Sequence, residues 1–436
     1  MFRNRKQAIL SVFILFFLAV GAFFMANVEL PQGSHYISAI NVLLFALPSY
    51  WAAKMWLGRR DGIILIVILG IYALLIETTA IISGFPYGHF GYSEHLGSKL
   101  FGLVPWTVAF AWPPLMFAAY AVSYNLTSSR ILRIVLTTLI LTAFDLVLDP
   151  GAVTLNFWSY PAGGIYYGVP ASNFLGWLFS GFIGSLIFEG FITYIKPLLP
   201  APAQLTVSAV FIIFFWTALS AFAGLLVPAL IGASIFAGSV LFYRAFYYAF
   251  DEMIVLVDDA DTPVATRRKS EVHDGNTKLH RAFSVFLFNS KGELLLQQRA
   301  FSKKTWPGVW SNSCCGHTML HESTPDAAVR RVGYELGLKK TKLTMALPDF
   351  RYRAEKDGVV ENELCPVLFG FTDAKPRPDP DEIADLKWVD WEEFRLSLNS
   401  PGSEISPWAV EEVELLAQSA IFRKYYSDNM KTPAQI

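Results

Sequence analysis

The feature that most constrains this fold is a series of long apolar segments that fills the first 250 residues and then stops. A segment of about 20 apolar residues has the length of a helix that crosses a bilayer. Charged residues make up only 16% of the chain, well below the roughly 25% that is usual for soluble domains. We therefore predict a polytopic α-helical membrane domain over residues 1–250, with about eight spans near 7–28, 36–56, 61–80, 101–124, 130–148, 174–199, 204–222 and 224–243.

The loops between these segments differ in their basic residues. Three loops, 29–35, 81–100 and 149–173, contain a single Lys or Arg between them, Lys99. Because cytoplasmic loops carry the excess of Lys and Arg, we predict that both termini lie in the cytoplasm. The loops placed on that side carry Arg3, Arg5, Lys6, Arg59, Arg60, Arg130, Arg133, Lys196, Arg244, Arg267, Arg268 and Lys269. The net charge of −1 gives no indication of a nucleic-acid partner.

The second half of the chain has the pattern of a soluble α/β domain. Residues 251–272 are first acidic and then basic and are interpreted as a linker, so the domain is placed at 273–436. Ala282–Phe288 and Glu293–Gln298 alternate as strands do, and the four residues between them form a turn of Asn, Ser, Lys and Gly. The predicted architecture is a membrane domain followed by a linker and an α/β domain.

All three cysteines, Cys314, Cys315 and Cys365, lie in this second half. They lack the spacing of a disulfide framework and favour a reducing compartment. In the run Asn-Ser-Cys-Cys-Gly-His at 312–317, the second cysteine precedes a histidine by two residues, so a thiol lies beside a potential metal ligand. A lone cysteine more often packs in a core than acts as a nucleophile, and a lone histidine is usually a surface or core residue. Cys365 and His321 are interpreted in this way.

The segment that follows contains part of a phosphate-binding motif on an expected helix over 324–337, capped by Thr324. It resembles the Nudix loop–helix–loop, whose glutamates bind magnesium on a diphosphate. Two positions that are usually acidic carry Arg331 and Tyr334, so the segment is better suited to hold a diphosphate than to cut it. The positions that match are Gly316, Glu322, Arg330 and Glu335.

Several longer stretches in the right order make a more specific match. Residues 265–425 resemble the type I isopentenyl-diphosphate isomerases over the whole length of that family. The stretches are Lys-Leu-His-Arg-Ala-Phe at 278–283, Gln-Arg-Ala-Phe-Ser-Lys-Lys-Thr-Trp-Pro-Gly at 298–308, Trp-Ser-Asn-Ser-Cys-Cys-Gly-His at 310–317, Asp-Phe-Arg-Tyr-Arg at 349–353, Glu-Asn-Glu at 361–363 and Ser-Pro-Trp at 406–408.

The resemblance implies the conversion of isopentenyl diphosphate to dimethylallyl diphosphate, in which an alkene is protonated and a neighbouring carbon loses a proton. It implies that Cys315 and Glu363 are the acid–base pair, that Tyr352 assists Glu363 and that Trp408 covers the cation. It implies one divalent metal (zinc, manganese or magnesium) on His273, His280, His317, Glu361 and Glu363. It further implies diphosphate contacts from Lys269, Arg299, Lys303 and Arg331, with a magnesium ion held by Glu335. A Nudix diphosphate hydrolase is the alternative.

Acidic residues inside the apolar segments are the functional candidates of the first half, because charge is costly in lipid. Glu77, Asp145 and Asp149 lie at the ends of segments, and Glu189 lies inside one. Asp145 and Asp149 are one helical turn apart and so share a face. The bland interpretation is that these acids only pair with basic or backbone donors.

Several loop motifs accompany these acids. They are Gly-Phe-Pro-Tyr-Gly at 84–88, Lys-Leu-Phe-Gly at 99–102, Asp-Leu-Val-Leu-Asp-Pro at 145–150, Gly-Val-Pro at 168–170 and Asn-Phe-Leu-Gly-Trp at 173–177. Over 40–245 the chain resembles the membrane carotenoid 1,2-hydratases, which implies addition of water to an end double bond of a long polyene. Glu77, Asp145 and Asp149 are then the candidate acids, unranked. A carotenoid or terpene cyclase, a non-catalytic anchor in the membrane lipid, and a non-catalytic isoprenoid transporter or scaffold are the alternatives.

Overall fold

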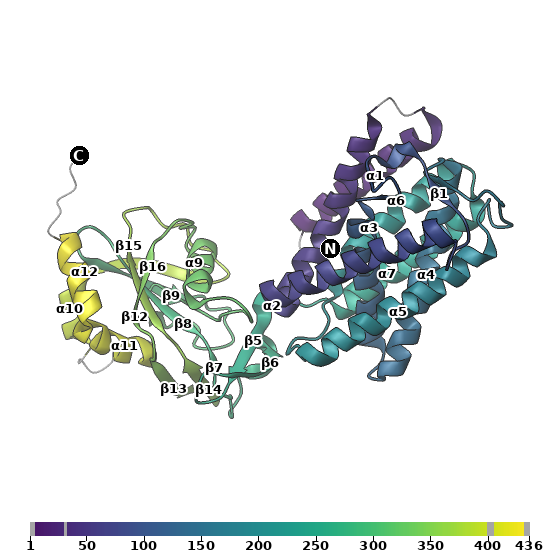
Figure 1. Cartoon of the computed structure of the whole chain (residues 1–436). Helices are drawn as coiled ribbons and strands as arrows, with labels where there is room; N and C mark the ends of the chain where they lie inside the picture. The colour runs from purple at the N-terminus through teal and green to yellow at the C-terminus, as the bar shows by residue number, and fades with distance from the viewer. Residues whose placement is uncertain (1–4, 30–32, 399–404, 431–436) are drawn as a thin grey trace. The chain divides into compact units, whose positions relative to one another are not determined.

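The computed structural model describes residues 5–29, 33–398 and 405–430. Arg3, one of the basic residues used to predict orientation, lies outside these ranges. The chain divides into two compact units, Met1–Tyr248 and Ala249–Ile436, which carry the purple-to-teal and the green-to-yellow colours of Figure 1. Each unit is described separately below.

The N-terminal unit is a bundle of helices. Helix α2 packs on α3, α4 packs on α5, and α6 packs on both α1 and α7. Many large apolar side chains on the outside of the bundle are exposed, among them Phe13, Leu75 and Leu175, as expected for helices that face lipid. The helices are α1 (Arg5–Asn27), α2 (Ser34–Ser83), α3 (Val108–Leu126), α4 (Arg130–Thr154), α5 (Ala171–Ile195), α6 (Val207–Phe222) and α7 (Leu226–Phe246).

The prediction of about eight spans is wrong, because six of the described helices are long and apolar enough to cross a membrane. The segments near 36–56 and 61–80 both fall within α2, where two helical parts meet at a kink at Gly58 (φ 81°, ψ 167°), and together they make up one of the six, Tyr36–Ser83. The expected span near 101–124 is α3, a 19-residue helix with Pro113 and Pro114 inside it, and α3 is not among the six. The six are Ile9–Asn27, Tyr36–Ser83, Arg130–Thr154, Ala171–Ile195, Ala203–Phe222 and Leu226–Glu252.

Two small sheets join the loops of this unit. Strand β1 (Gly91–Tyr92) pairs antiparallel with β4 (Trp158–Ser159), and β2 (Lys99–Leu100) pairs with β3 (Val104–Pro105). Short 3-10 turns, η1 (Glu94–Leu96) and η2 (Ala203–Thr206), complete the connections. The β1–β4 pair ties the loop after α2 to the loop after α4 and so brings together two loops with many aromatic residues.

The C-terminal unit is an α/β domain with two sheets. The larger sheet has the order β10-β9-β8-β15-β12, with β11 on β8 and β16 on β9, and the smaller has the order β13-β14-β7-β5-β6. Its strands are β5 (Met253–Val257), β6 (Pro263–Arg268), β7 (His280–Arg281), β8 (Phe283–Phe288), β9 (Glu293–Arg299), β10 (Trp310–Ser311), β11 (Cys314–Gly316), β12 (Leu343–Leu347), β13 (Arg351–Lys356), β14 (Val359–Leu364), β15 (Val367–Phe371) and β16 (Ile383–Asp390).

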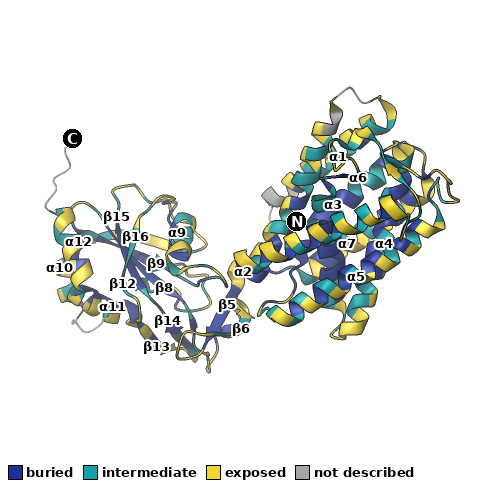
Figure 2. Ribbon diagram, viewed as in Figure 1, coloured by how far each residue is buried: buried dark blue, intermediate teal, exposed yellow. Residues whose placement is uncertain are grey.

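The larger sheet is covered on both faces, because strand β8 is buried along its whole length. Its odd-numbered residues pack in the cluster that includes α9 (Thr324–Glu335). Its even-numbered Phe286 and Phe288 pack in a second cluster, with α10 (Trp391–Ser397), α11 (Pro407–Gln418) and α12 (Ala420–Met430). Alternating side chains thus serve both cores, and Figure 2 shows the central strands dark blue.

The structure supports the strands and the helix expected here, with two differences. Strands β8 and β9 match the expected pair, while the N-cap of α9 is Ser323, whose side chain accepts a hydrogen bond from the amide of Asp326. Residues 251–272, interpreted as a linker, hold the antiparallel strands β5 and β6, followed by the short helix α8 (Lys269–Val272). Pairing of β5 with β7 through Leu256 and His280 makes them part of the smaller sheet.

Candidate active site

Strand pairing in the smaller sheet brings the histidines and acids of the C-terminal unit together. Glu363 on β14 lies opposite His280 on the parallel strand β7. Glu361 lies two residues earlier on β14 and therefore on the same side of the strand. His317 follows directly after β11, and His273 follows α8. The nearest oxygens of Glu363 lie 3.4 Å from His280 Nε2 and 3.2 Å from His317 Nε2, and Glu361 lies 3.2 Å from His273 Nε2.

This cluster has the chemistry of a divalent metal site. One donor atom each from His273, His280, His317 and Glu363 lies within 4.8 Å of the others. His280 Nε2, His317 Nε2 and Glu361 Oε2 are buried and have no hydrogen-bond partner among the described residues. His280 places its other ring nitrogen 2.9 Å from the carbonyl of Lys278, which leaves Nε2 for a ligand. Burial lowers the pKa of His317 to about 3, so its imidazole is neutral, the form that binds metals.

Cys315 lines a cavity of about 500 Å³ together with Glu363, Tyr352 and Trp408. Its thiol donates to Asn312 Oδ1 at 3.0 Å and lies 3.6 Å from Ser284 Oγ. Burial, together with the smaller effect of the nearby Glu412, raises the pKa of this thiol to about 12. The thiol is therefore protonated at neutral pH and can act as an acid.

The neighbouring Cys314 has a different environment, although the two cysteines are adjacent in sequence. Successive residues of a strand point to opposite faces, and Cys314 packs fully buried in the core cluster beneath α9. Its thiol donates to Glu335 Oε2 at 3.5 Å. Cys314 does not line the cavity, which agrees with the choice of Cys315 as the reactive cysteine.

Glu363 carries a charge suited to a base. Burial alone would raise its pKa, but the neighbouring imidazoles of His280 and His317 hold the pKa well below its usual range. Tyr352 donates its hydroxyl to Glu363 Oε2 at 2.8 Å. The ring of Tyr352 lies 5.4 Å from that of Trp408, and Trp408 is fixed by a bond of 3.1 Å from its Nε1 to Ser311 Oγ. An acid thiol and a charged carboxylate thus share one aromatic cavity.

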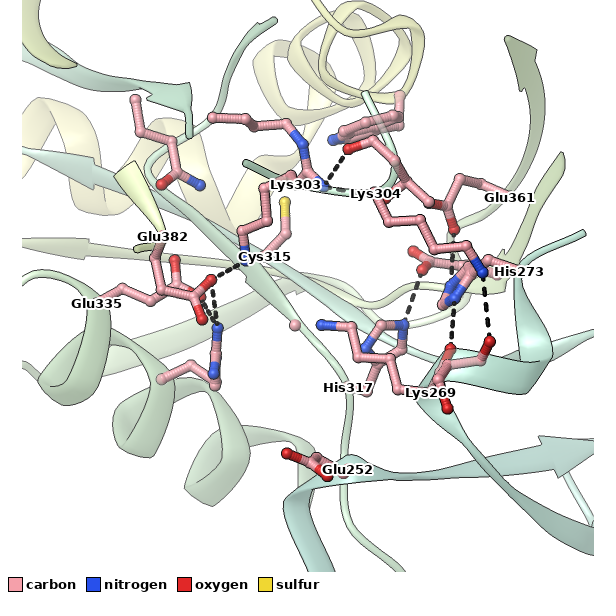
Figure 3. Close-up of a pocket in the computed structure, with 18 of the residues that line it drawn as sticks. Glu252, Lys269, His273, Lys303, Lys304, Cys315, His317, Glu335, Glu361 and Glu382 are labelled. Carbon is pink, nitrogen blue, oxygen red and sulfur yellow. Dashed lines mark hydrogen bonds and ion pairs between the residues drawn. The ribbon is translucent and has the colours of Figure 1, made fainter. Parts of the chain in front are cut away.

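The other end of the cavity is lined by cations and two further acids. Figure 3 shows Cys315 between Glu335 and Glu382 on one side and His273 and Glu361 on the other. Arg331 pairs with both Glu335 and Glu382, and Lys303 pairs with Glu382. The Lys and Arg residues of the lining are Arg268, Lys269, Arg299, Lys303, Lys304 and Arg331. Such a cluster suits an oligoanion such as a diphosphate.

The carboxylates of the Nudix-like segment are not gathered as a hydrolase would need. Glu322 accepts two hydrogen bonds of 2.8 Å from Arg330 and a third from the amide of Met319, so it fixes the loop. Tyr334, at a position that is usually acidic, is 56% exposed. Of the acids on α9, Glu335 alone lines the cavity.

The sequence interpretation missed several contributors to this site. Asn312, which accepts the thiol proton, lies only three residues before Cys315 in the motif and could have been selected as a polar residue beside it. Glu382, Lys304 and Arg268 line the cavity, but no pattern in the sequence marks them. They reach the site from separate strands and loops.

The acids of the N-terminal unit fall into three different environments. Glu189 is held by Arg133 through bonds of 2.7 and 3.0 Å and by Tyr120 at 2.7 Å. Asp145 and Asp149 both accept from the amide of Asn173, at 2.8 and 2.6 Å.

Asp149 accepts a further hydrogen bond, of 2.9 Å, from the hydroxyl of Tyr160. Glu77 accepts from Tyr92 at 2.8 Å and lines a second cavity of about 380 Å³. The ion-paired interpretation therefore applies to Glu189 and not to the other three.

The fold and this site define the C-terminal unit as a Nudix domain with a His/Glu metal-type centre, and the family comparison agrees. Residues 278–409 match the NUDIX domain family, and residues 33–239 match the family described as carotenoid biosynthesis protein. The solved structure of a MutT protein from Methanosarcina mazei is 18% identical, with a TM-score of 0.26, and the match covers 35% of this chain and 96% of that one.

Curated relatives give the narrower family. The isopentenyl-diphosphate Delta-isomerase of Saccharopolyspora erythraea is 47% identical over 168 residues, which is 38% of this chain and 87% of the relative. The enzyme of the same name from Mycolicibacterium vanbaalenii is 48% identical over 171 residues, which is 39% of this chain and 94% of the relative. The chain belongs, through its C-terminal unit, to the isopentenyl-diphosphate Delta-isomerase family.

Proposed function

We propose that the C-terminal unit interconverts isopentenyl diphosphate and dimethylallyl diphosphate. The observation that carries this proposal is that a protonated thiol, Cys315, and a charged carboxylate, Glu363, line one aromatic cavity whose other end is cationic. Relatives that are 47% and 48% identical carry the corresponding name. The diphosphate lies among Lys269, Lys303 and Arg331, and the five-carbon chain extends toward Trp408.

The residues then divide the reaction between them. The thiol of Cys315 gives its proton to the terminal CH₂ carbon of the alkene, which leaves a tertiary cation. Glu363 removes a proton from the neighbouring carbon, and the double bond moves by one position. Tyr352 keeps Glu363 oriented, and the indole face of Trp408 stabilises the cation and excludes water.

Two metal roles accompany this assignment. His273, His280, His317, Glu361 and Glu363 would hold a divalent ion, zinc, manganese or magnesium, whose charge fixes the orientation of the carboxylate. Glu335, which pairs with Arg331 in this structure, would hold a magnesium ion on the diphosphate. Both ions would supply electrostatic stabilisation, while the proton transfers belong to the side chains.

The test uses the full chain in detergent with isopentenyl diphosphate and divalent metal. We expect the allylic isomer as product. Cys315→Ala should abolish it, while Cys314→Ala, which changes the adjacent thiol outside the cavity, should retain it. Release of phosphate without the isomer would support a Nudix hydrolase instead.

We further propose that the N-terminal unit hydrates an end double bond of a long lipophilic polyene in the membrane. Three features support this: the match to a carotenoid biosynthesis family, buried acids at the ends of its helices and an apolar cavity. We place both termini and the isomerase unit on the cytoplasmic side, on the basis of the loop charges.

Expression of the full chain in a lycopene-producing host tests this second proposal. A hydroxylated pigment supports hydration. A cyclised pigment supports a cyclase, and unchanged pigment supports an anchor.

A further inference from the structure

We propose that Glu77 is the acid of the N-terminal unit and that it protonates the end double bond of an acyclic isoprenoid polyene inside the 380 Å³ cavity. This inference rests on the hydration proposed above and narrows it to one residue. The sequence offered Glu77, Asp145 and Asp149 on equal terms. The structure separates them by where each carboxyl lies and what each one contacts.

The cavity suits the end of a hydrocarbon chain. Its size, about 380 Å³, is in the range of small-molecule pockets and would take the end of a polyene rather than its whole length. Four tryptophans line it, Trp112, Trp158, Trp177 and Trp216. Indole faces stabilise a carbocation better than any other side-chain ring. The lining comes from helices α1 to α6 and from the loops that carry β1, β3 and β4, so the cavity lies at the loop end of the bundle.

Within the described part of the chain, Glu77 is the only Asp, Glu, His, Lys or Arg residue in this lining. Its side chain is buried, and its recorded partner is the hydroxyl of Tyr92 at 2.8 Å. No Lys or Arg forms an ion pair with it among the described residues. A buried carboxyl without a cation is more stable in its protonated form, which is the form that an acid catalyst needs.

The two aspartates have a different arrangement. Asp145 on α4 and Asp149 one turn later both bind the amide of Asn173 on α5, so they fasten two helices together. Neither lines the cavity. The ring centroid of Phe90 lies 5.3 Å from that of Tyr92 and 5.8 Å from that of Tyr160. Tyr92 donates a hydrogen bond to Glu77, and Tyr160 donates one to Asp149. The aspartates therefore lie outside the cavity, where they hold α4 and α5 together and do not reach the polyene.

The cavity also contains a polar group that, within the described residues, has no hydrogen-bond partner. The indole N–H of Trp112 lines the same cavity, is buried and donates no hydrogen bond within the described residues. Such a donor is costly unless it is satisfied. We assign it to the oxygen that enters or leaves the site, either the attacking water or the hydroxyl of the product.

The reaction balances with water as the only co-reactant. Glu77 transfers its proton to the less substituted alkene carbon, and the electron pair of the double bond forms the new C–H bond. Water adds to the tertiary cation that results. The oxonium then returns one proton to the Glu77 carboxylate, so that one H₂O is added to the polyene and Glu77 is regenerated.

The experiment compares variants of the full chain in a lycopene-producing host. Glu77→Gln preserves size and the bond from Tyr92 but cannot donate a proton. We expect the hydroxylated pigment to fall roughly 100-fold or more, the lower end of what a general acid contributes. Asp145→Asn, an acid-to-amide change outside the cavity, should retain product at an equal amount of membrane protein. Glu77→Asp, which keeps the acid group, should retain more activity than Glu77→Gln.

The outcomes separate the two proposals. Hydroxylated pigment from the wild type and equally from Glu77→Gln would refute the role of Glu77 and leave hydration standing. Unchanged pigment from a wild type present at a normal level would refute both. Loss with Asp145→Asn but not with Glu77→Gln would reverse the ranking. Bound lycopene that copurifies with the inactive Glu77→Gln chain would support Glu77 further, because it shows an intact cavity.

Discussion

Tyr352→Phe is the sharpest test of the proposed proton transfer, because it removes one oxygen and leaves the packing. Tyr352 is 6% exposed, and its hydroxyl donates to Glu363 at 2.8 Å. A hydrogen bond to a charged group contributes about 1.5–3 kcal/mol. If that bond is needed in the transition state, the rate of isomerisation should fall on the order of 10- to 100-fold. The phenyl ring should keep its contact with Trp408.

The same change predicts a shift in pH dependence. The bond from Tyr352 favours the charged carboxylate, so its loss should raise the pKa of Glu363. The base is active when charged, and the acidic limb of the kcat profile should therefore move to higher pH. KM for isopentenyl diphosphate should change little, because the diphosphate is bound at the cationic end of the cavity.

The assay is steady-state isomerisation as a function of pH, with Tyr426→Phe as the matched control. Tyr426 also donates its hydroxyl, at 2.9 Å, but to the carbonyl of Gly292, and it does not line the cavity. That control should lose some stability and keep its kcat. A Tyr352→Phe chain with wild-type kcat and an unmoved acidic limb would show that the hydroxyl does not assist Glu363, and the division of roles would then be wrong.

Three further predictions follow from other contacts. Removal of divalent metal with a chelator should abolish isomerisation and lower the unfolding temperature of the C-terminal unit, and added zinc, manganese or magnesium should restore both, because a ligand bound only to the folded state stabilises it; calorimetry and activity measure this. Burial raises the pKa of the Cys315 thiol to about 12, so less than a thousandth of it is thiolate at pH 8; alkylation by iodoacetamide should be much slower than for free cysteine and should accelerate with pH, and rapid alkylation at pH 7 would contradict the acid role. Arg133→Met leaves the buried Glu189 with only the largely exposed Arg130, at 3.9 Å, as a cation and should destabilise the N-terminal unit by about 3 kcal/mol, while Arg133→Lys should lose less; thermal unfolding in detergent compares them.

Local signals in the sequence were sufficient for much of the C-terminal unit. Alternation, a four-residue turn and a helix stop set β8, β9 and α9, because these features depend on neighbours in the chain. The motif around 312–317 gave Cys315 and His317, and spacing by two placed Glu361 and Glu363 on one side of a strand. Glu382, which pairs with Lys303 and Arg331, could not be found in this way. Its position depends on the pairing of β16 with β9.

The N-terminal unit was harder to predict for a physical reason. Hydropathy measures length and apolarity, and neither shows how two apolar segments are joined, as the two helical parts of α2 are at the kink at Gly58. The pattern also records that an acid is near a helix end without recording what surrounds it. Glu77 and Asp145 look alike in sequence, and Glu189 differs only in lying inside a segment, but Glu77 lines a cavity, Asp145 holds α4 to α5 and Glu189 pairs with Arg133. Only the packing of several helices distinguishes them.

The two proposed sites begin with the same chemical step and differ in the groups that act on the cation afterwards. Each protonates an alkene to give a tertiary cation, and each surrounds that cation with aromatic rings. The C-terminal site adds a charged base, Glu363, beside the acid thiol, so a proton leaves the cation and the product is a new alkene. Among the described residues, the lining of the N-terminal cavity contains one Asp or Glu, Glu77, and an unsatisfied donor, Trp112, so the cation is left for water. Because a five-carbon diphosphate and a long polyene are separated by many synthetic steps, shared expression explains the fusion without any passage of substrate between the units.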